Sequence, residues 1–116
     1  PRLLVPLHGE AEPAPGGPVS LDQARHAARL TGLQTPTSVR LALGSLDRVV
    51  RVVKVLGMVN CAPGMNQTSK VVDGCSELFL DVFGPEIGRH ARSAVGVFEL
   101  PLDFPVEIEV IMEIRD

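Results

Sequence analysis

Arg92, Glu107 and Glu109 are the charged side chains of this 116-residue chain whose types and spacing could act on a small organic acid. An arginine presents a planar fork of donors that can grip a carboxylate at two points. A glutamate on the face of a sheet can hold or activate a water molecule. The alternative, which periodicity alone favours, is an ion-pair network on a solvated or interfacial face.

The other reactive side chains form no second constellation in the sequence. Cys61 and Cys75 are expected to be reduced thiols, with one disulfide as the alternative. His8, His26 and His90 lie far apart and lack zinc-ligand spacing, so we expect no bound metal. The chain has neither a Walker-type phosphate loop nor a GxGxxG segment, and we expect no cofactor.

Composition and charge limit the classes of function. Hydrophobic residues make up 45% and charged residues 22%, so we expect residues 1–116 to form a single globular domain. A net charge of −3, four Phe and no Trp or Tyr argue against nucleic acid as a partner. No apolar run is long enough to span a membrane. The expected compartment is the cytoplasm, with mitochondria as the alternative if a transit peptide has been removed.

The N-terminal half predicts a strand, a loop and a helix. The apolar run 3–7 contains Pro6 and indicates an edge strand, and the Pro- and Gly-rich residues 8–18 indicate a loop. Ser20 followed by Gln23 forms a capping box that starts a helix with an apolar stripe. Pro36 lies inside this stripe, which predicts either a kinked helix or two short helices in register.

The C-terminal half predicts three strands and a second helix. Residues 49–59 are β-branched and apolar, as in a central strand covered on both faces over much of its length. A helix is expected over 68–83, and strands over 92–100 and 106–114, the last with glutamates on one face. If the last two strands form a hairpin, Arg92 lies toward the far end from Glu107. The predicted fold is an α/β (α+β) sandwich: a mixed, mostly antiparallel sheet with two main helices on one face.

Residues 90–97 (HARSAVGV), 100–102 (LPL) and 106–109 (VEIE) closely resemble the C-terminal signature of the RidA/YjgF family, long labelled endoribonuclease L-PSP. The RVVKV run at 51–55 and the predicted second helix fit the same family in order and spacing. The resemblance covers about residue 20 to the C-terminus and is closest to a less characterised branch. It implies the chorismate-mutase-like fold and a homotrimer with a central barrel of sheets and ligand clefts between subunits.

The resemblance also implies roles for four residues. Arg92 would bind the carboxylate of a reactive enamine or imine such as 2-aminoacrylate, and Glu107 would position the water that attacks it. Ala94 would supply backbone to the pocket. Asp73 stands where the family commonly has Asn, and its charge would disfavour an anionic ligand. Hydrolysis would release ammonia and a 2-oxo acid, with orientation and a positioned water as the main requirements.

The N-terminal region departs from the family pattern. The chain has no Tyr for the pocket, and residues 2–4 lack the family's Ser-Gly-Gln segment. We therefore expect residues 1–116 to be one RidA/YjgF-like domain without the family's N-terminal strands, either shortened or missing them from this sequence. Three functions stay open: an enamine/imine deaminase, a non-catalytic trimer that binds small carboxylates or 2-oxo acids, and an endoribonuclease.

Overall fold

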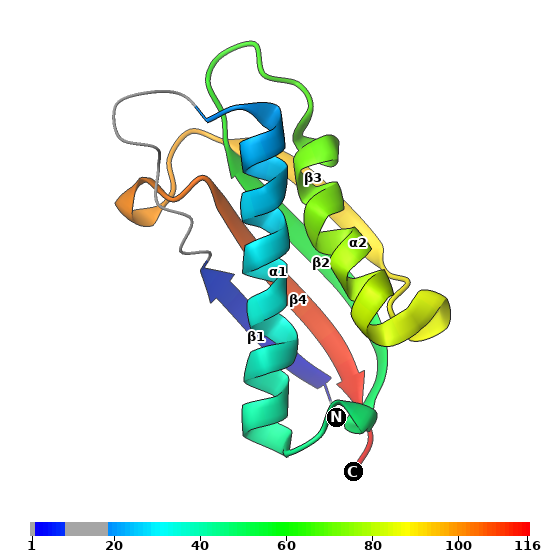
Figure 1. Cartoon of the computed structure of the whole chain (residues 1–116). Coiled ribbons are helices and arrows are strands. Elements are labelled where there is room, and N and C mark those ends of the chain that lie inside the picture. Colours follow the sequence, from blue (N-terminus) through cyan, green and yellow to red (C-terminus); the bar gives the residue numbers. More distant parts are fainter. Residues whose placement is uncertain (1, 9–18) are drawn as a thin grey trace.

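The computed structural model describes residues 2–8, as backbone, and residues 19–116 with their side chains. The expected loop over 8–18 therefore lies outside the described residues except for its first residue. The elements in chain order are β1 (Arg2–His8), α1 (Leu21–Leu43), β2 (Val49–Asn60), α2 (Thr68–Ile87), β3 (Ala91–Val97) and β4 (Val106–Ile114) (Figure 1). Short 3₁₀ turns precede β2 and β4 at Leu46–Arg48 and Pro101–Asp103.

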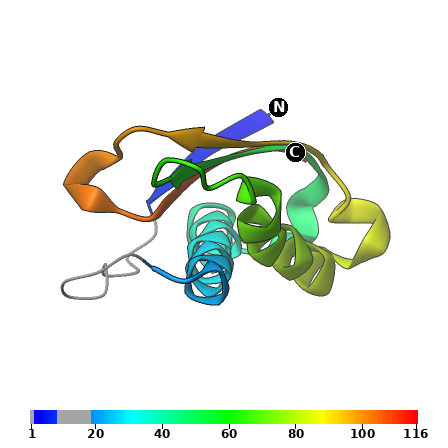
Figure 2. The same cartoon turned by 90° about the horizontal axis from the view of Figure 1, so that it is seen from above.

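Within the described residues the strands form a mixed sheet in the order β1-β4-β2-β3. The β1–β4 and β4–β2 pairs are antiparallel, and the β2–β3 pair is parallel. Both helices cover the same face of the sheet (Figure 2). The predicted mixed sheet with two helices on one side is confirmed, and β1 is the edge strand that Pro6 indicated.

The last two strands do not form a hairpin, because β2 lies between β3 and β4. The reason is the crossover of the chain from β2 through α2 to β3. Such a crossover brings the next strand back parallel to the first, here on the outer side of β2. The connection from β3 to β4 then passes the end of β2 and places β4 on its other side.

Helix α1 starts where the sequence predicts and ends at Leu43. The Ser20 hydroxyl accepts a hydrogen bond from the Gln23 backbone N–H at 3.1 Å, and the Gln23 side chain accepts one from the Ser20 N–H at 2.9 Å. Gly44 ends the helix in the left-handed region, at φ 82°. A single helix runs through Pro36, so the alternative of two short helices is not what forms.

Helix α2 begins at Thr68 as predicted and has a break in helical geometry at Gly84, where φ is 83°. One further turn carries the helix to Ile87. Two glycines set the position of α2, because a Cβ at Gly57 would overlap the Val72 side chain and a Cβ at Gly74 would overlap the Arg25 carbonyl. The backbone of α2 at Gly74 therefore lies against the backbone of α1, and the Val72 side chain of α2 lies against the backbone of β2 at Gly57.

The core lies between the sheet and the helices, and the other sheet face is only partly covered. Along β4 the residues alternate between buried and half-buried, with the glutamates on the outer face. On β2 the outward Val53, Leu56 and Met58 are half-buried and Lys54 is exposed. The prediction that the central strand is covered on both faces is therefore wrong for the described chain. The reason is that both helices of the described chain lie on one face of the sheet, so neither covers the other face of β2 (Figure 2).

No helix in the described ranges is long and apolar enough to cross a membrane.

Candidate functional site

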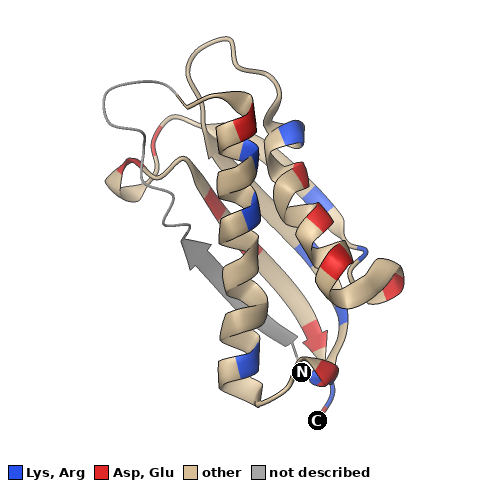
Figure 3. Cartoon of the chain, in the orientation of Figure 1, with Lys and Arg blue, Asp and Glu red and all other residues tan. Residues whose placement is uncertain are grey.

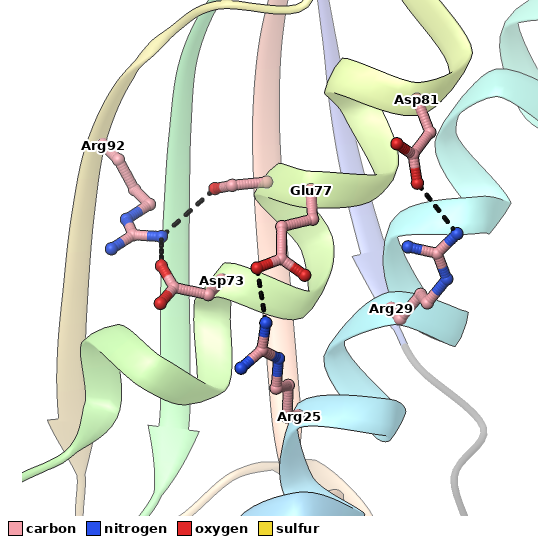
Figure 4. Close-up of polar contacts among 7 residues, drawn as sticks. Arg25, Arg29, Asp73, Glu77, Asp81 and Arg92 are labelled. Carbon is pink, nitrogen blue, oxygen red and sulfur yellow. Dashed lines mark hydrogen bonds and ion pairs between the residues drawn. The ribbon is translucent and has the colours of Figure 1, made fainter.

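Arg92 lies on the side of β3 that faces α2. It stands opposite Val55 of β2, which is fully buried beneath the helices. Its Nη1 donates to Asp73 Oδ1 at 2.7 Å and to Ser76 Oγ at 3.2 Å (Figure 4). The side chains of Arg92 and Asp73 are 23% and 40% exposed. The guanidinium is thus held against α2 by one nitrogen and remains within reach of solvent.

His90 extends this contact into a chain of hydrogen bonds. Its Nδ1 lies 2.6 Å from the Gly88 carbonyl oxygen, and its Nε2 lies 2.9 Å from Ser76 Oγ. Because a carbonyl only accepts, Nδ1 carries the proton and Nε2 of the neutral ring accepts from the Ser76 hydroxyl. The ring also meets Phe79 edge-on, with centroids 5.9 Å apart. The Ser76 oxygen therefore connects His90 to Arg92.

Burial lowers the pKa of His90 below its ordinary value of 6.5, and the charge of Arg92 lowers that pKa further. The hydrogen bond to the Gly88 carbonyl acts in the opposite direction, as the second largest effect. The net lowering keeps the ring neutral at pH 7, in the state that accepts the Ser76 proton.

The two cysteines are free thiols outside this chain of contacts. Cys75 is fully buried beneath α1, and burial raises the pKa of its thiol to about 12 although the Arg92 charge lowers it. Burial also raises the pKa of Cys61, which is half-buried. Neither thiol has the lowered pKa of a reactive nucleophile.

Glu107 lies on the opposite face of the sheet from Arg92. Its neighbours Val106 and Ile108 are buried toward the helices, so the Glu107 side chain points the other way and is half-buried beside Met58. The whole width of β2 separates its strand from β3. One chain therefore does not bring Arg92 and Glu107 together, and a site that uses both requires a second chain.

The other two predicted site residues lie on the Arg92 side. Asp73 contacts Arg92 directly. Ala94 follows two positions after Arg92 on the same face of β3, opposite Gly57. Its carbonyl oxygen accepts a hydrogen bond from the Thr68 hydroxyl at 3.0 Å. Arg92, Asp73 and Ala94 thus lie on the same side of the sheet within one chain.

Sequence reasoning missed Ser76 and His90, although a signal for them exists. Asp73 and Ser76 are three apart on a helix and share a face, and His90 and Arg92 are two apart at a strand and share a face. The two pairs come into contact only when α2 packs over β3. The strand order, which the sequence did not reveal, was needed to connect them.

Two further ion pairs join the helices away from this site. Arg25 pairs with Glu77, and Arg29 pairs with Asp81 at 3.1 Å (Figure 4). Basic residues of α1 thus face acidic residues of α2 (Figure 3). All four side chains are more than two-fifths exposed, so each pair contributes little to stability.

A cavity of about 460 Å³ lies at the far end of β2, lined among others by Ser20, Val59, Cys61 and Met65. Arg92 does not line it. The cavity and the charged groups therefore do not coincide in one chain. Among the side chains of residues 19–116, no three His, Cys, Asp or Glu are grouped as a metal site.

No family profile matches the sequence. A curated relative, protein TCP17 of Trypanosoma cruzi, is 44% identical over 101 residues, which cover 87% of this chain and 63% of TCP17. This chain thus spans less than two thirds of that relative. A solved protein of unknown function from Agrobacterium tumefaciens is 33% identical, with a TM-score of 0.87 over 97% of this chain and 76% of that one. A protein named as a putative endoribonuclease from Shewanella oneidensis is 23% identical, also with a TM-score of 0.87, over 97% and 79%.

Two more distant structures share the fold. One is YyfB of the conserved Rid protein family from Yersinia pestis, at 18% identity and a TM-score of 0.60 over 97% and 78% of the two chains. The other is TdcF of Escherichia coli, crystallised with bound serine, at 20% identity and a TM-score of 0.58 over 99% and 81%. The structure is thus of the chorismate-mutase-like α+β class. Within that class, the chain belongs to the RidA/YjgF family.

Proposed function

We propose that this protein hydrolyses reactive enamine and imine intermediates of the 2-aminoacrylate type, with Arg92 as the anchor for the substrate carboxylate. The observation that carries the proposal is the state of the Arg92 guanidinium. Only its Nη1 is engaged within the described chain, so Nε and Nη2 keep their donors. An arginine that is partly exposed and partly free can bind a carboxylate at two points. The serine-bound relative TdcF supports an amino-acid-sized ligand.

The reaction needs few groups, because an imine carbon is already electrophilic. Water adds to that carbon, and a proton moves to the nitrogen. The carbon–nitrogen bond then breaks, and ammonia leaves a 2-oxo acid behind. A glutamate that holds the water and accepts its proton is sufficient as the general base. In this proposal Glu107 has that role, and the backbone at Ala94 borders the pocket.

The proposal requires a second chain, since Arg92 and Glu107 lie on opposite faces of one sheet, and the assembly we propose is the homotrimer that the family resemblance implies. The outer face of the sheet suits such an assembly, because half-buried Leu56, Met58 and Ile111 surround the glutamates there. Sheets packed through this face would form the inner barrel, and Glu107 of one protomer would meet Arg92 of the next. The proposed compartment is the cytoplasm, which suits the two free thiols.

The test measures ammonia and 2-oxo acid release from 2-aminoacrylate generated in situ by a serine dehydratase. We expect the Arg92→Ala variant to fall to the uncatalysed rate. The Arg29→Ala variant, which removes an exposed arginine of α1, serves as the matched control and should keep the full rate. Equal rates for the wild type and Arg92→Ala would refute the proposal. Size-exclusion chromatography with light scattering tests the trimer separately.

A second candidate is a non-catalytic binder of small carboxylates. The separation of Arg92 from Glu107 within one chain favours it, because Arg92 can bind a carboxylate without the proposed general base. This candidate predicts that serine or a 2-oxo acid raises the melting temperature of the wild type but not of Arg92→Ala, with no turnover by either. RNA cleavage, the third alternative, would have to survive stringent purification and disappear in a defined point mutant.

A further inference from the structure

We infer that Ser76 and His90 are positioning residues for Arg92, which leave the Nε–Nη2 edge of its guanidinium as the edge that takes the ligand carboxylate. The inference rests on the proposed function, in which Arg92 binds that carboxylate. It adds two residues to the site and the direction from which the ligand approaches.

The hydrogen count of the guanidinium decides which edge is open. A guanidinium has five N–H donors and two edges that can hold a carboxylate at two points: Nη1 with Nη2, or Nε with Nη2. Nη1 carries two hydrogens, and these go to Asp73 Oδ1 at 2.7 Å and Ser76 Oγ at 3.2 Å. The first edge is therefore closed. Of the three donors that remain, Nε–H and one Nη2–H form the second edge.

The direction of the Ser76 hydroxyl is set from the end of α2. The Gly88 carbonyl fixes the proton of His90 on Nδ1, so Nε2 can only accept while the ring is neutral. The single hydroxyl hydrogen of Ser76 then points to His90, and a lone pair of the same oxygen faces Arg92. The Gly88 carbonyl thus makes His90 Nε2 an acceptor, and His90 in turn leaves the Ser76 oxygen to accept from Arg92.

The charges around His90 favour this arrangement at neutral pH. The charge of Arg92 acts on the ring directly, and Asp73 pairs with Arg92. Two more arginines line a hollow beside the ring: Arg89, which precedes β3, and Arg51 of β2, which pairs with Glu113 at 3.9 Å. The hollow, which His90 also lines, has a volume of about 340 Å³. A proton on Nε2 would make His90 a cation that donates to Ser76. The Ser76 oxygen would then lie between protonated His90 and Arg92.

The experiment compares Ser76→Ala with Ser76→Thr, which keeps a hydroxyl at the same place on the helix. Serine affinity is measured by calorimetry, and kcat and KM with 2-aminoacrylate generated in situ. One lost hydrogen bond predicts a roughly fivefold loss of affinity and rise in KM for Ser76→Ala, with kcat nearly unchanged. Ser76→Thr should restore both. The ratio of the serine affinity of the wild type to that of Ser76→Ala should fall toward one in acid, where His90 is protonated.

The ligand edge is read directly from the NMR signal of Arg92 Nε–H, identified by its loss in Arg92→Lys. Addition of serine should shift this signal. The inference is wrong if the signal does not move, or if Ser76→Ala binds serine as tightly as Ser76→Thr does. In either case, a loss of serine binding in Arg92→Ala still supports the proposed function. If Arg92→Ala binds serine as the wild type does, both fail together.

Discussion

Replacing Asp73 by Asn should strengthen the binding of small carboxylates. The Asp73 carboxylate lies 2.7 Å from Arg92 Nη1 and neutralises much of the charge that would attract an anionic ligand. An asparagine oxygen can still accept the Nη1 hydrogen bond, so the position of the guanidinium should be kept. The substitution thus removes one negative charge with little change in geometry.

The magnitude follows from the two carboxylates that would share one guanidinium. Charge-assisted hydrogen bonds of about 2.8 Å on two sides of the group place the carboxylates about 6 Å apart. Their repulsion then lies between about 0.7 kcal/mol in a water-like dielectric and about 2.8 kcal/mol near a protein surface. Asp73 is 40% exposed, which favours the lower part of this range. A value of about 1 kcal/mol corresponds to roughly fivefold tighter binding.

Calorimetric titration with serine or a 2-oxo acid measures this change. Asp81→Asn is the matched control, because it removes a carboxylate from the same helix that pairs with Arg29. The gain for Asp73→Asn should shrink as salt is added, since screening weakens the repulsion in the wild type. The electrostatic reasoning would be refuted if Asp73→Asn bound the carboxylate no more tightly than the wild type at low salt.

Three further predictions concern packing and protonation. Gly74→Ala should destabilise the fold by about 1–3 kcal/mol, because the new Cβ overlaps the Arg25 carbonyl and outweighs the helix propensity of Ala. An unchanged urea midpoint would contradict this. Thr35→Val should stabilise the fold by about 1 kcal/mol, since the Thr35 hydroxyl is buried without a hydrogen-bond partner in the described chain. Calorimetry should record a higher melting temperature, and a lower one would oppose the assignment. Cys75, whose thiol pKa is raised to about 12, should stay unlabelled by a thiol reagent at pH 8.5 while half-buried Cys61 reacts. Mass spectrometry of the folded protein reads out both sites, and rapid labelling of Cys75 would show that it is accessible.

Local signals predicted the elements well because they act within one or two turns of chain. The Ser20 capping box and the glycine after the last turn set both ends of α1. The alternation of β4 gave its length and its two faces. Pro36 was less informative, because packing of the buried helix face holds α1 together across one missing hydrogen bond.

Strand order decided the site, and local signals do not contain it. A hairpin of β3 and β4 was a reasonable hypothesis from their closeness in sequence. The crossover through α2 instead placed β3 outside β2, under the helix face that carries Asp73 and Ser76. The same order left Glu107 on the far face and a full strand away.

The sequence by itself determined the family and the elements and singled out Arg92 as a candidate, because motif spacing and periodicity are properties of contiguous residues. Only the tertiary structure decided what Arg92 touches. Its partners Asp73 and Ser76 lie 19 and 16 residues away along the chain, and long-range packing of α2 on the sheet brings them into contact. Contacts of that kind depend on the arrangement of whole elements, which no short stretch of sequence encodes.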